Sequence, residues 1–202
     1  MSNRCSEKIA DAIWVAESLF SRGKVSGSAA NLSFRHEDTI YISAGGSCFG
    51  RLREDSFAVL DMEGKHLGGP APSKEFPLHH MLYLHDKSTR AVLHTHSTYA
   101  TLWSCLMPGS EVIPSHTPYL KMRVGEIAYV PYAKPGSQEL FQAFKEKLGT
   151  SRAYLLANHG PVVAASDIIA AFYDMEEIEE AARNAWLLRG SSINKIYESP
   201  AV

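Results

Sequence analysis

The stretch AVLHTH, residues 91–96, predicts both a central strand and a metal site. Its apolar lead-in is typical of a buried strand, and the strand ends in two histidines separated by one residue. Because strand side chains alternate between faces, His94 and His96 point the same way, and both imidazoles can reach one metal ion. Chance alone gives about 0.4 such pairs among nine histidines in 202 residues, so the pair needs support from elsewhere in the chain.

A third histidine supplies that support. His159 follows the apolar run at residues 155–157 and precedes a glycine, so it also lies at the end of an expected strand. Three neutral imidazoles with an open fourth position form a normal catalytic zinc set, and we therefore expect His94, His96 and His159 to bind a divalent metal. The alternative is that all three are hydrogen-bonded core residues, which is the commoner role of any one histidine taken singly.

Length and composition are those of an ordinary globular protein. A chain of 202 residues can bury a sizeable core without a second domain, so we expect one domain over residues 1–202. The formal net charge of -2 argues against a nucleic-acid or membrane surface and favours a small-molecule partner. Three scattered cysteines suggest reduced thiols, and the charged N-terminal residues 1–20 exclude a signal peptide or membrane span there. We therefore expect a cytoplasmic protein.

Apolar patterns predict a mixed, partly antiparallel sheet with helices on both faces. The first helix is expected over residues 9–20, with Ser6 as its N-cap and Gly23 as its stop. The last is expected from a cap at Ser166 or Asp167 to Gly190. Three more helices are expected over residues 74–86, 97–106 and 138–147. Strands are expected at residues 32–34, 39–43, 57–61, 65–67, 91–96, 126–130, 153–157 and 161–165. The first four strands pair as two hairpins.

Glu75 is the candidate acid because it sits where a helix is expected to begin. Ser73 is suited to be the N-cap of the helix predicted over residues 74–86, and Pro77 is tolerated in a first turn. On that helix Glu75 and His79 are four residues apart and share a face. A carboxylate in a first turn often does no more than complement the helix dipole, which is the alternative role.

The loop AGGS at residues 44–47 is a candidate for anion binding. Its glycines let the backbone approach a ligand closely, and successive N–H groups in such a loop can face a phosphate. Taken alone, the same four residues are equally typical of an ordinary turn.

Three motifs together resemble the class II aldolase/adducin family over nearly the whole chain. They are SAANLS at residues 28–33, PSKE at 72–75, and HTH at 94–96 with a distant HG at 159–160. Within that family the sequence is most similar to the 3-oxo-tetronate 4-phosphate decarboxylases. This likeness rests on GSCFGRL at residues 46–52, on the lysine before the acid, and on YLKMRVG at 119–125.

The resemblance implies a three-layer α/β/α subunit, with sites that lie between the subunits of a homotetramer. It implies that His94, His96 and His159 hold one divalent ion per subunit, usually zinc, with manganese or cobalt as alternatives. It implies that Glu75 is the acid/base beside that ion. Tyr119 falls near the place where the aldolases offer a tyrosine proton donor from the neighbouring subunit. Candidates for the phosphate and substrate pocket are Ser28, Asn31, Gly45, Gly46, Ser47, Ser73 and Lys74.

Lys74 favours a substrate with two anionic groups. The matching aldolase position is commonly a small hydroxyl residue that contacts phosphate, so a lysine adds a positive charge beside the site. A substrate with both phosphate and carboxylate would use that charge. A lysine that held the carboxylate firmly would slow its loss, so Lys74 orienting the phosphate is a second interpretation, and a solvent-facing lysine is the third.

The resemblance implies decarboxylation of 3-oxo-tetronate 4-phosphate to dihydroxyacetone phosphate and CO2, through a zinc-stabilised enediolate, in the breakdown of four-carbon sugar acids. The alternative is a class II aldolase or epimerase acting on fuculose 1-phosphate or ribulose 5-phosphate, or a dehydratase on the same scaffold, because these enzymes would share the ligands and the acid. An adducin-like interaction module would have lost the three histidines and Glu75, and all four are present.

Overall fold

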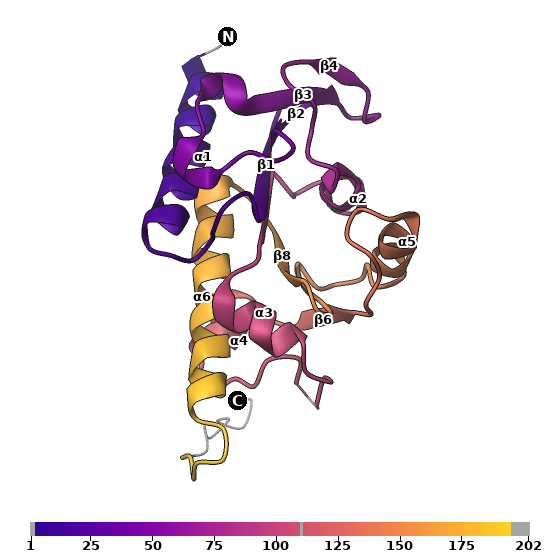
Figure 1. Ribbon diagram of the computed structural model, residues 1–202. Helices are drawn as coiled ribbons and strands as arrows, with labels where there is room; N and C mark the ends of the chain where they lie inside the picture. The colour runs from indigo at the N-terminus through magenta and orange to yellow at the C-terminus, as the bar shows by residue number, and fades with distance from the viewer. Residues whose placement is uncertain (1–2, 110, 195–202) are drawn as a thin grey trace, which may run out of the picture.

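A single eight-stranded sheet forms the centre of the molecule, seen in a computed structural model that describes residues 3–109 and 111–194 (Figure 1). The strands lie in the order β4-β3-β2-β1-β5-β8-β7-β6. Only β6 and β7 pair in parallel, and the other neighbouring strands are antiparallel. The strands are β1 (Ala30–His36), β2 (Thr39–Ser43), β3 (Phe57–Asp61), β4 (His66–Gly68), β5 (Ala91–Thr95), β6 (Ile127–Val130), β7 (Ala153–Leu156) and β8 (Gly160–Ala165).

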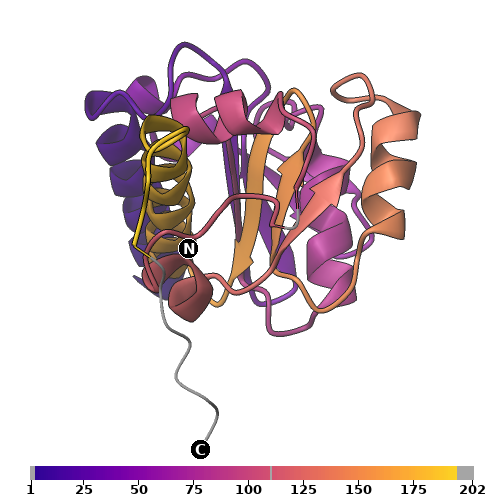
Figure 2. The same cartoon turned by 90° about the horizontal axis from the view of Figure 1, so that it is seen from below.

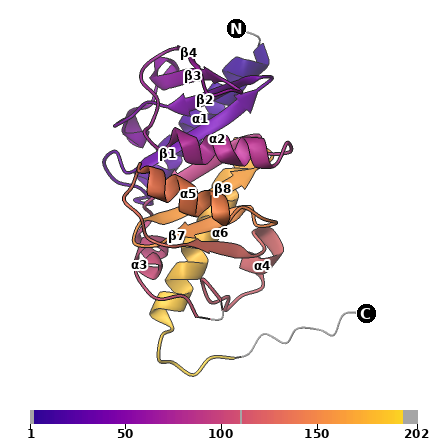
Figure 3. The ribbon, with the colours of Figure 1, turned by 90° about the vertical axis from the view of Figure 1, so that its right-hand side faces the viewer.

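Helices cover both faces of this sheet, which gives the three-layer α/β/α arrangement (Figure 2). α1 (Asn3–Ser21) and α6 (Ile168–Leu187) lie on one face, and α2 (Phe76–His85) and α5 (Gln138–Glu146) lie side by side on the other (Figure 3). The remaining helices are α3 (Thr98–Ser104), α4 (Tyr119–Arg123) and the 3-10 turns η1 (Phe49–Arg51) and η2 (Glu54–Ser56). None of these described helices is long and apolar enough to cross a membrane.

The core is divided by the sheet into two apolar clusters. Leu93 of β5 belongs to the cluster beneath α1 and α6, whereas the preceding Val92 belongs to the cluster beneath α2 and α5. This alternation is the period-two pattern of a strand with both faces covered. It explains why the run at residues 91–93 is apolar throughout. Both side chains are fully buried, and burying each stabilises the fold by about 1.5–3 kcal/mol.

The predicted hairpins and fold class are confirmed, but three helices begin differently from the prediction. α1 is already helical at Asn3, so Ser6 lies within it rather than at its cap. α2 begins at Phe76 rather than at residue 74, because a turn closed by the Phe76 N–H and the Ser73 carbonyl precedes it. α3 begins at Thr98 rather than at residue 97, with Ser97 at its N-cap position and no capping hydrogen bond from the Ser97 side chain.

Other boundaries differ by a few residues. β5 ends at Thr95, so His96 lies just beyond the strand predicted over residues 91–96. α4 was not predicted because its five residues are too few to show a helical period. Asp167, one of two predicted caps for α6, accepts a hydrogen bond from the Ala170 N–H. One domain over residues 1–202 stays a prediction, since residues 1–2, 110 and 195–202 lie outside the described residues.

Candidate active site

The three predicted histidines meet at one end of the central strands. His94 is on β5, where it pairs with Asn31 of β1 on one side and with Val162 of β8 on the other. His96 directly follows β5, and His159 lies in the turn between β7 and β8. Because β5 and β8 are hydrogen-bonded neighbours, this turn brings His159 to the end of β5. Residues that are 65 positions apart in the chain therefore share one site.

The three imidazole rings present their Nε2 atoms to one another. The Nε2 of His94 lies 3.2 Å from the Nε2 of His159 and 3.2 Å from the Nε2 of His96. Zinc–nitrogen bonds of about 2.0–2.1 Å in a tetrahedral site place two ligand nitrogens about 3.3 Å apart. The spacing of this cluster therefore fits a single tetrahedral divalent ion, and its ligand atoms lie within 4.8 Å of one another.

Protonation of the rings is also suited to metal binding. The Nδ1 of His94 donates a hydrogen bond to the Pro161 carbonyl at 2.9 Å, which leaves its Nε2 lone pair free for a metal. Burial lowers the pKa of His94 to about 3 and also lowers the pKa of His96. Both rings are therefore neutral at physiological pH, which is the form that coordinates metals.

Glu75 faces the histidine cluster from the N-cap position of α2. Its Oε2 lies 3.3 Å from the Nε2 of His94, and its Oε1 lies 3.3 Å from the Nε2 of His159. Asn31 donates a hydrogen bond to the same carboxylate at 3.0 Å. Burial alone would raise the pKa of Glu75, but the hydrogen bond with His159, the electrostatic attraction of the His94 and His159 rings and the Asn31 bond together hold that pKa below its usual range.

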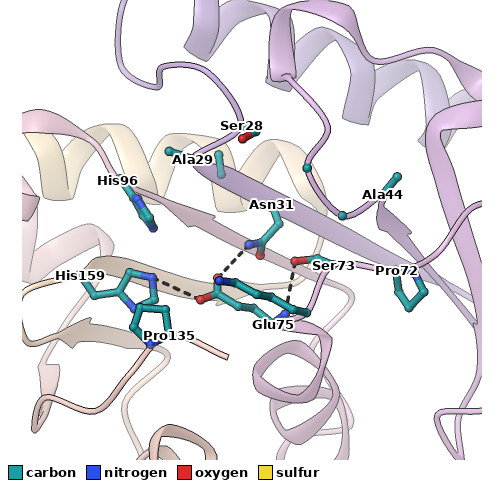
Figure 4. A pocket seen from close by; sticks show the side chains of 14 residues that line it. Ser28, Ala29, Asn31, Ala44, Pro72, Ser73, Glu75, His96, Pro135 and His159 are labelled. Carbon is teal, nitrogen blue, oxygen red and sulfur yellow. Dashed lines mark hydrogen bonds and ion pairs between the residues drawn. The ribbon is translucent and has the colours of Figure 1, made fainter. Parts of the chain in front are cut away.

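A pocket of about 490 Å³ opens beside this cluster. His96, His159 and Glu75 line it, and the buried His94 lies behind them. Figure 4 shows His96 and His159 on one side of the pocket and Ala44 with Pro72 on the other. The pocket contains six of the predicted substrate-binding residues, namely Ser28, Asn31, Gly45, Gly46, Ser73 and Lys74.

The loop at residues 44–47 packs closely against the segment that precedes Glu75. The Gly45 N–H donates to the Ala71 carbonyl at 3.1 Å, and Ala44 forms an isolated β-bridge with Pro72. A Cβ added at Gly45 would lie 3.2 Å from the Pro72 carbonyl oxygen. Glycine at this position therefore allows the loop and the start of α2 to form one wall of the pocket.

Lys74 is the only cationic side chain among the described residues that line the pocket. Its ammonium group forms no ion pair with any of the described residues. Burial is the main cause of the lowered pKa of His96, and the positive charge of Lys74 adds to it. The aliphatic stem of Lys74 runs past Gly136, where an added Cβ would lie 3.0 Å from its Cδ.

Besides the buried His94, two predicted residues do not line the pocket. Ser47 follows the glycines but turns its hydroxyl inward, where that group is buried without a hydrogen-bond partner among the described residues. Tyr119 begins α4 with 61% of its surface exposed and lies outside the pocket of its own chain. Sequence reasoning missed Pro135, which lines the pocket from the loop before α5. The Pro-Gly pair at residues 135–136 indicates a turn but gives no sign of which site that turn reaches.

The geometry agrees with the sequence comparisons. The sequence profile described as Class II Aldolase and Adducin N-terminal domain matches residues 10–186. This chain belongs to that family. The family assignment that the three motifs predicted is therefore confirmed, and the match spans both Glu75 and the three histidines.

Several members of the class II aldolase family are close relatives of this chain. A 3-oxo-tetronate 4-phosphate decarboxylase of Haemophilus influenzae is 39% identical over 190 residues, which is 93% of this chain and 90% of the relative. An L-fuculose phosphate aldolase of Methanococcus maripaludis is 35% identical, over 87% of this chain and 94% of the relative. The crystal structure of YgbL from Klebsiella pneumoniae superimposes with a TM-score of 0.89 at 37% identity, covering 93% of this chain and 92% of that one.

Proposed function

We propose that this chain catalyses the metal-dependent decarboxylation of 3-oxo-tetronate 4-phosphate to dihydroxyacetone phosphate and CO2. One observation carries the proposal: a single pocket lies against the three-histidine cluster and is lined by a carboxylate that contacts this cluster and by a lysine that has no ion pair among the described residues. A 3-oxo acid phosphate needs an electrophile at its ketone, an acid at the neighbouring carbon and positive charge for its anions. The name of the Haemophilus influenzae relative supports the same reaction.

The reaction breaks the bond between the carboxylate carbon and the carbon next to the ketone. The electron pair of that bond passes to the ketone oxygen as CO2 leaves, which gives an enediolate. A divalent ion held by His94, His96 and His159 would polarise the ketone and stabilise this negative charge. The three rings that would hold it come from β5, from the residue directly after β5, and from the turn between β7 and β8.

Glu75 is the group that we assign to return a proton to carbon. It is the only carboxylate among the described residues that line the pocket, and it lies against two of the three ligand rings. The carboxylate is ionised at rest, so it takes up a proton before delivering one, and the negative charge of an incoming substrate favours that uptake. Proton delivery to the carbon that lost CO2 yields dihydroxyacetone phosphate.

The remaining pocket residues bind the anionic groups of the substrate. Gly45 and Gly46 expose backbone at one wall, and the Ser28 and Ser73 side chains flank it. Lys74 offsets negative charge for a substrate that carries both a phosphate and a carboxylate. An uncharged sugar would leave this lysine without a partner in the pocket.

Zinc is the metal that we propose, one ion per chain, because three neutral imidazoles form a normal catalytic zinc set. Manganese and cobalt are alternatives, since imidazole sites accept several metals. We also propose a cytoplasmic homotetramer. Tyr119 is exposed and outside the pocket of its own chain, so a role as proton donor requires a second copy to bring it to the site.

Product analysis tests the function. Zinc-loaded protein is mixed with enzymatically generated 3-oxo-tetronate 4-phosphate, and dihydroxyacetone phosphate and CO2 are measured against a protein-free blank. The blank is needed because 3-oxo acids lose CO2 unaided. We expect rapid formation of both products in equal amounts, and its loss in the Glu75→Gln variant.

The same assay separates the decarboxylase from the aldolase alternative. L-fuculose 1-phosphate is offered in parallel, because the Methanococcus maripaludis relative is named for that substrate. Cleavage of fuculose 1-phosphate with a 3-oxo acid rate no better than the blank would replace the proposal with aldol cleavage. A protein that binds no divalent ion and processes neither substrate would favour the adducin-like interaction module.

A further inference from the structure

A chain of buried hydrogen bonds runs from Glu75 into the interior of the protein. Asn31 donates from Nδ2 to the Glu75 Oε2 at 3.0 Å, and its Oδ1 lies 2.5 Å from the Nε2 of His79. The Nδ1 of His79 lies 2.8 Å from the Ser33 Oγ, which lies 2.7 Å from the Tyr83 hydroxyl. Asn31, Ser33, His79 and Tyr83 all have exposed fractions of 7% or less.

The donor and the acceptor of each hydrogen bond between Glu75, Asn31, His79 and Ser33 can be assigned. Asn31 turns its NH2 group toward the Glu75 carboxylate and its Oδ1 toward His79. The Oδ1 of Asn31 can only accept, so the Nε2 of His79 carries the proton. Burial lowers the pKa of His79 to about 4, so the ring is neutral at physiological pH and its Nδ1 accepts from the Ser33 hydroxyl.

Without His79 the Oδ1 of Asn31 would lose its buried hydrogen-bond donor, and only the bond to Glu75 would hold the amide. A flipped amide would place its oxygen against the Glu75 carboxylate, replacing a hydrogen bond with repulsion between two acceptors. His79 lies on α2, four residues after Glu75, whereas Asn31 lies on β1 of the central sheet. The Nε2 of His79 thus ties the carboxylate to the central sheet through one amide group.

The structure assigns His79 as a positioning residue for Glu75, which it orients through the amide of Asn31. The assignment rests on the proposed role of Glu75 as acid/base in the reaction. His79 does not line the pocket, and its two ring nitrogens bond to Asn31 and Ser33 rather than to the three histidines of the metal cluster. Its loss should therefore lower the rate of proton transfer while leaving substrate affinity and metal affinity in place.

Two near-isosteric substitutions test this assignment. In His79→Gln the side-chain amide nitrogen can take the place of Nε2 and still donate to Asn31. In His79→Asn the shorter side chain reaches only the Nδ1 position, so it can meet Ser33 but leaves the Asn31 Oδ1 unpaired. We expect His79→Asn to lower kcat roughly 10- to 100-fold, with KM and zinc affinity within twofold of wild type, and His79→Gln to retain kcat within about threefold.

A second variant keeps the test open if His79→Asn does not fold. Ser33→Ala removes the donor to Nδ1 and leaves Asn31 as the partner that holds the His79 ring, so we expect a smaller fall in kcat. Nitrogen-15 NMR of the imidazole should show a protonated Nε2 both in the wild type and in Ser33→Ala, because the Asn31 Oδ1 can only accept. This spectrum requires no substrate, so it decides the orientation even if the wild type proves inactive toward 3-oxo-tetronate 4-phosphate.

Three results would overturn the assignment. The first is an unchanged kcat in folded His79→Asn when the wild type is active. The second is a fall in kcat matched by an equal loss of zinc affinity, which would mean that the substitution disturbs the histidine cluster. The third is a wild-type spectrum with the proton on Nδ1. By contrast, a wild type that shows protonated Nε2 and no decarboxylation would refute the proposed function while leaving the orientation of Asn31 established.

Discussion

The Glu179 carboxylate on α6 accepts a hydrogen bond from the Ala100 N–H at 2.9 Å, although the two residues are 79 positions apart in the chain. It also accepts from the Tyr99 N–H at 3.1 Å, so it satisfies the N-terminus of α3 in place of Ser97. Both ends of α3 lie next to the site. Its start follows His96, and its last residue, Ser104, accepts a hydrogen bond from the His159 N–H.

Replacing Glu179 with alanine should destabilise the protein and loosen the metal site. Two backbone N–H groups would lose their acceptor in a buried position, which costs about 2–4 kcal/mol in the free energy of unfolding. We also expect weaker zinc binding, because α3 would hold His96 and His159 less firmly. Glu177→Ala on the same helix is the control. Urea denaturation should show a large loss for Glu179→Ala only, and equal losses in the two variants would contradict the capping role.

Zinc should stabilise the folded protein through the three histidines. A ligand present at about 100 times its Kd adds about 2.7 kcal/mol to the free energy of unfolding, so Tm should rise when zinc is added to metal-free protein. The rise should vanish in His94→Ala. His66→Ala removes an exposed histidine on β4 and should retain the zinc-dependent rise in Tm. Equal zinc responses in the two variants, measured by scanning calorimetry, would place the metal elsewhere.

Gly136 should control the position of Lys74. Gly136 has φ +78, and an added Cβ would crowd the stem of Lys74 at 3.0 Å, whereas Gly125 has φ +79 and open space around it. Alanine at either position should lose about 1–2 kcal/mol of stability from the left-handed backbone. Only Gly136→Ala should also raise KM for the doubly anionic substrate. Equal KM values in the two variants would show that the crowding has no effect on the site.

Acid should destabilise the fold through His79. Its pKa is lowered from 6.5 to about 4 in the folded state, so between these pH values the unfolded chain binds a proton that the folded chain does not. The associated stability is complete above about pH 6.5 and is lost as the pH falls to about 4, by up to about 3 kcal/mol. His79→Gln lacks this titration. Its unfolding free energy should fall less over that range, and parallel curves would contradict the assigned burial effect.

Local patterns in the sequence predicted most of the fold. Short apolar runs on either side of polar turns predicted the two hairpins formed by β1 to β4, and the apolar run before His94 predicted a buried strand. The His94–His96 spacing predicted two ligands on one side of β5, and the resemblance to the family added Glu75. These features depend on neighbours within a few residues, where pattern and structure are directly linked.

Contacts between distant segments were not predictable in the same way. Nothing near Glu179 indicates that it caps α3, and nothing near Pro135 indicates that it lines the pocket. The pair Glu75 and His79 was recognised as one helix face, yet their link through Asn31 depends on how α2 packs against β1. The inward turn of the Ser47 hydroxyl likewise depends on tertiary packing.

The most direct test is decarboxylation of 3-oxo-tetronate 4-phosphate by the zinc-loaded protein in D2O. If Glu75 delivers the proton within this pocket, the dihydroxyacetone phosphate formed above the blank rate should carry one deuterium at the carbon that lost CO2, always on the same face. Glu75→Gln should lose that excess product. A wild-type rate equal to the blank, with deuterium distributed evenly over both faces, would contradict the account.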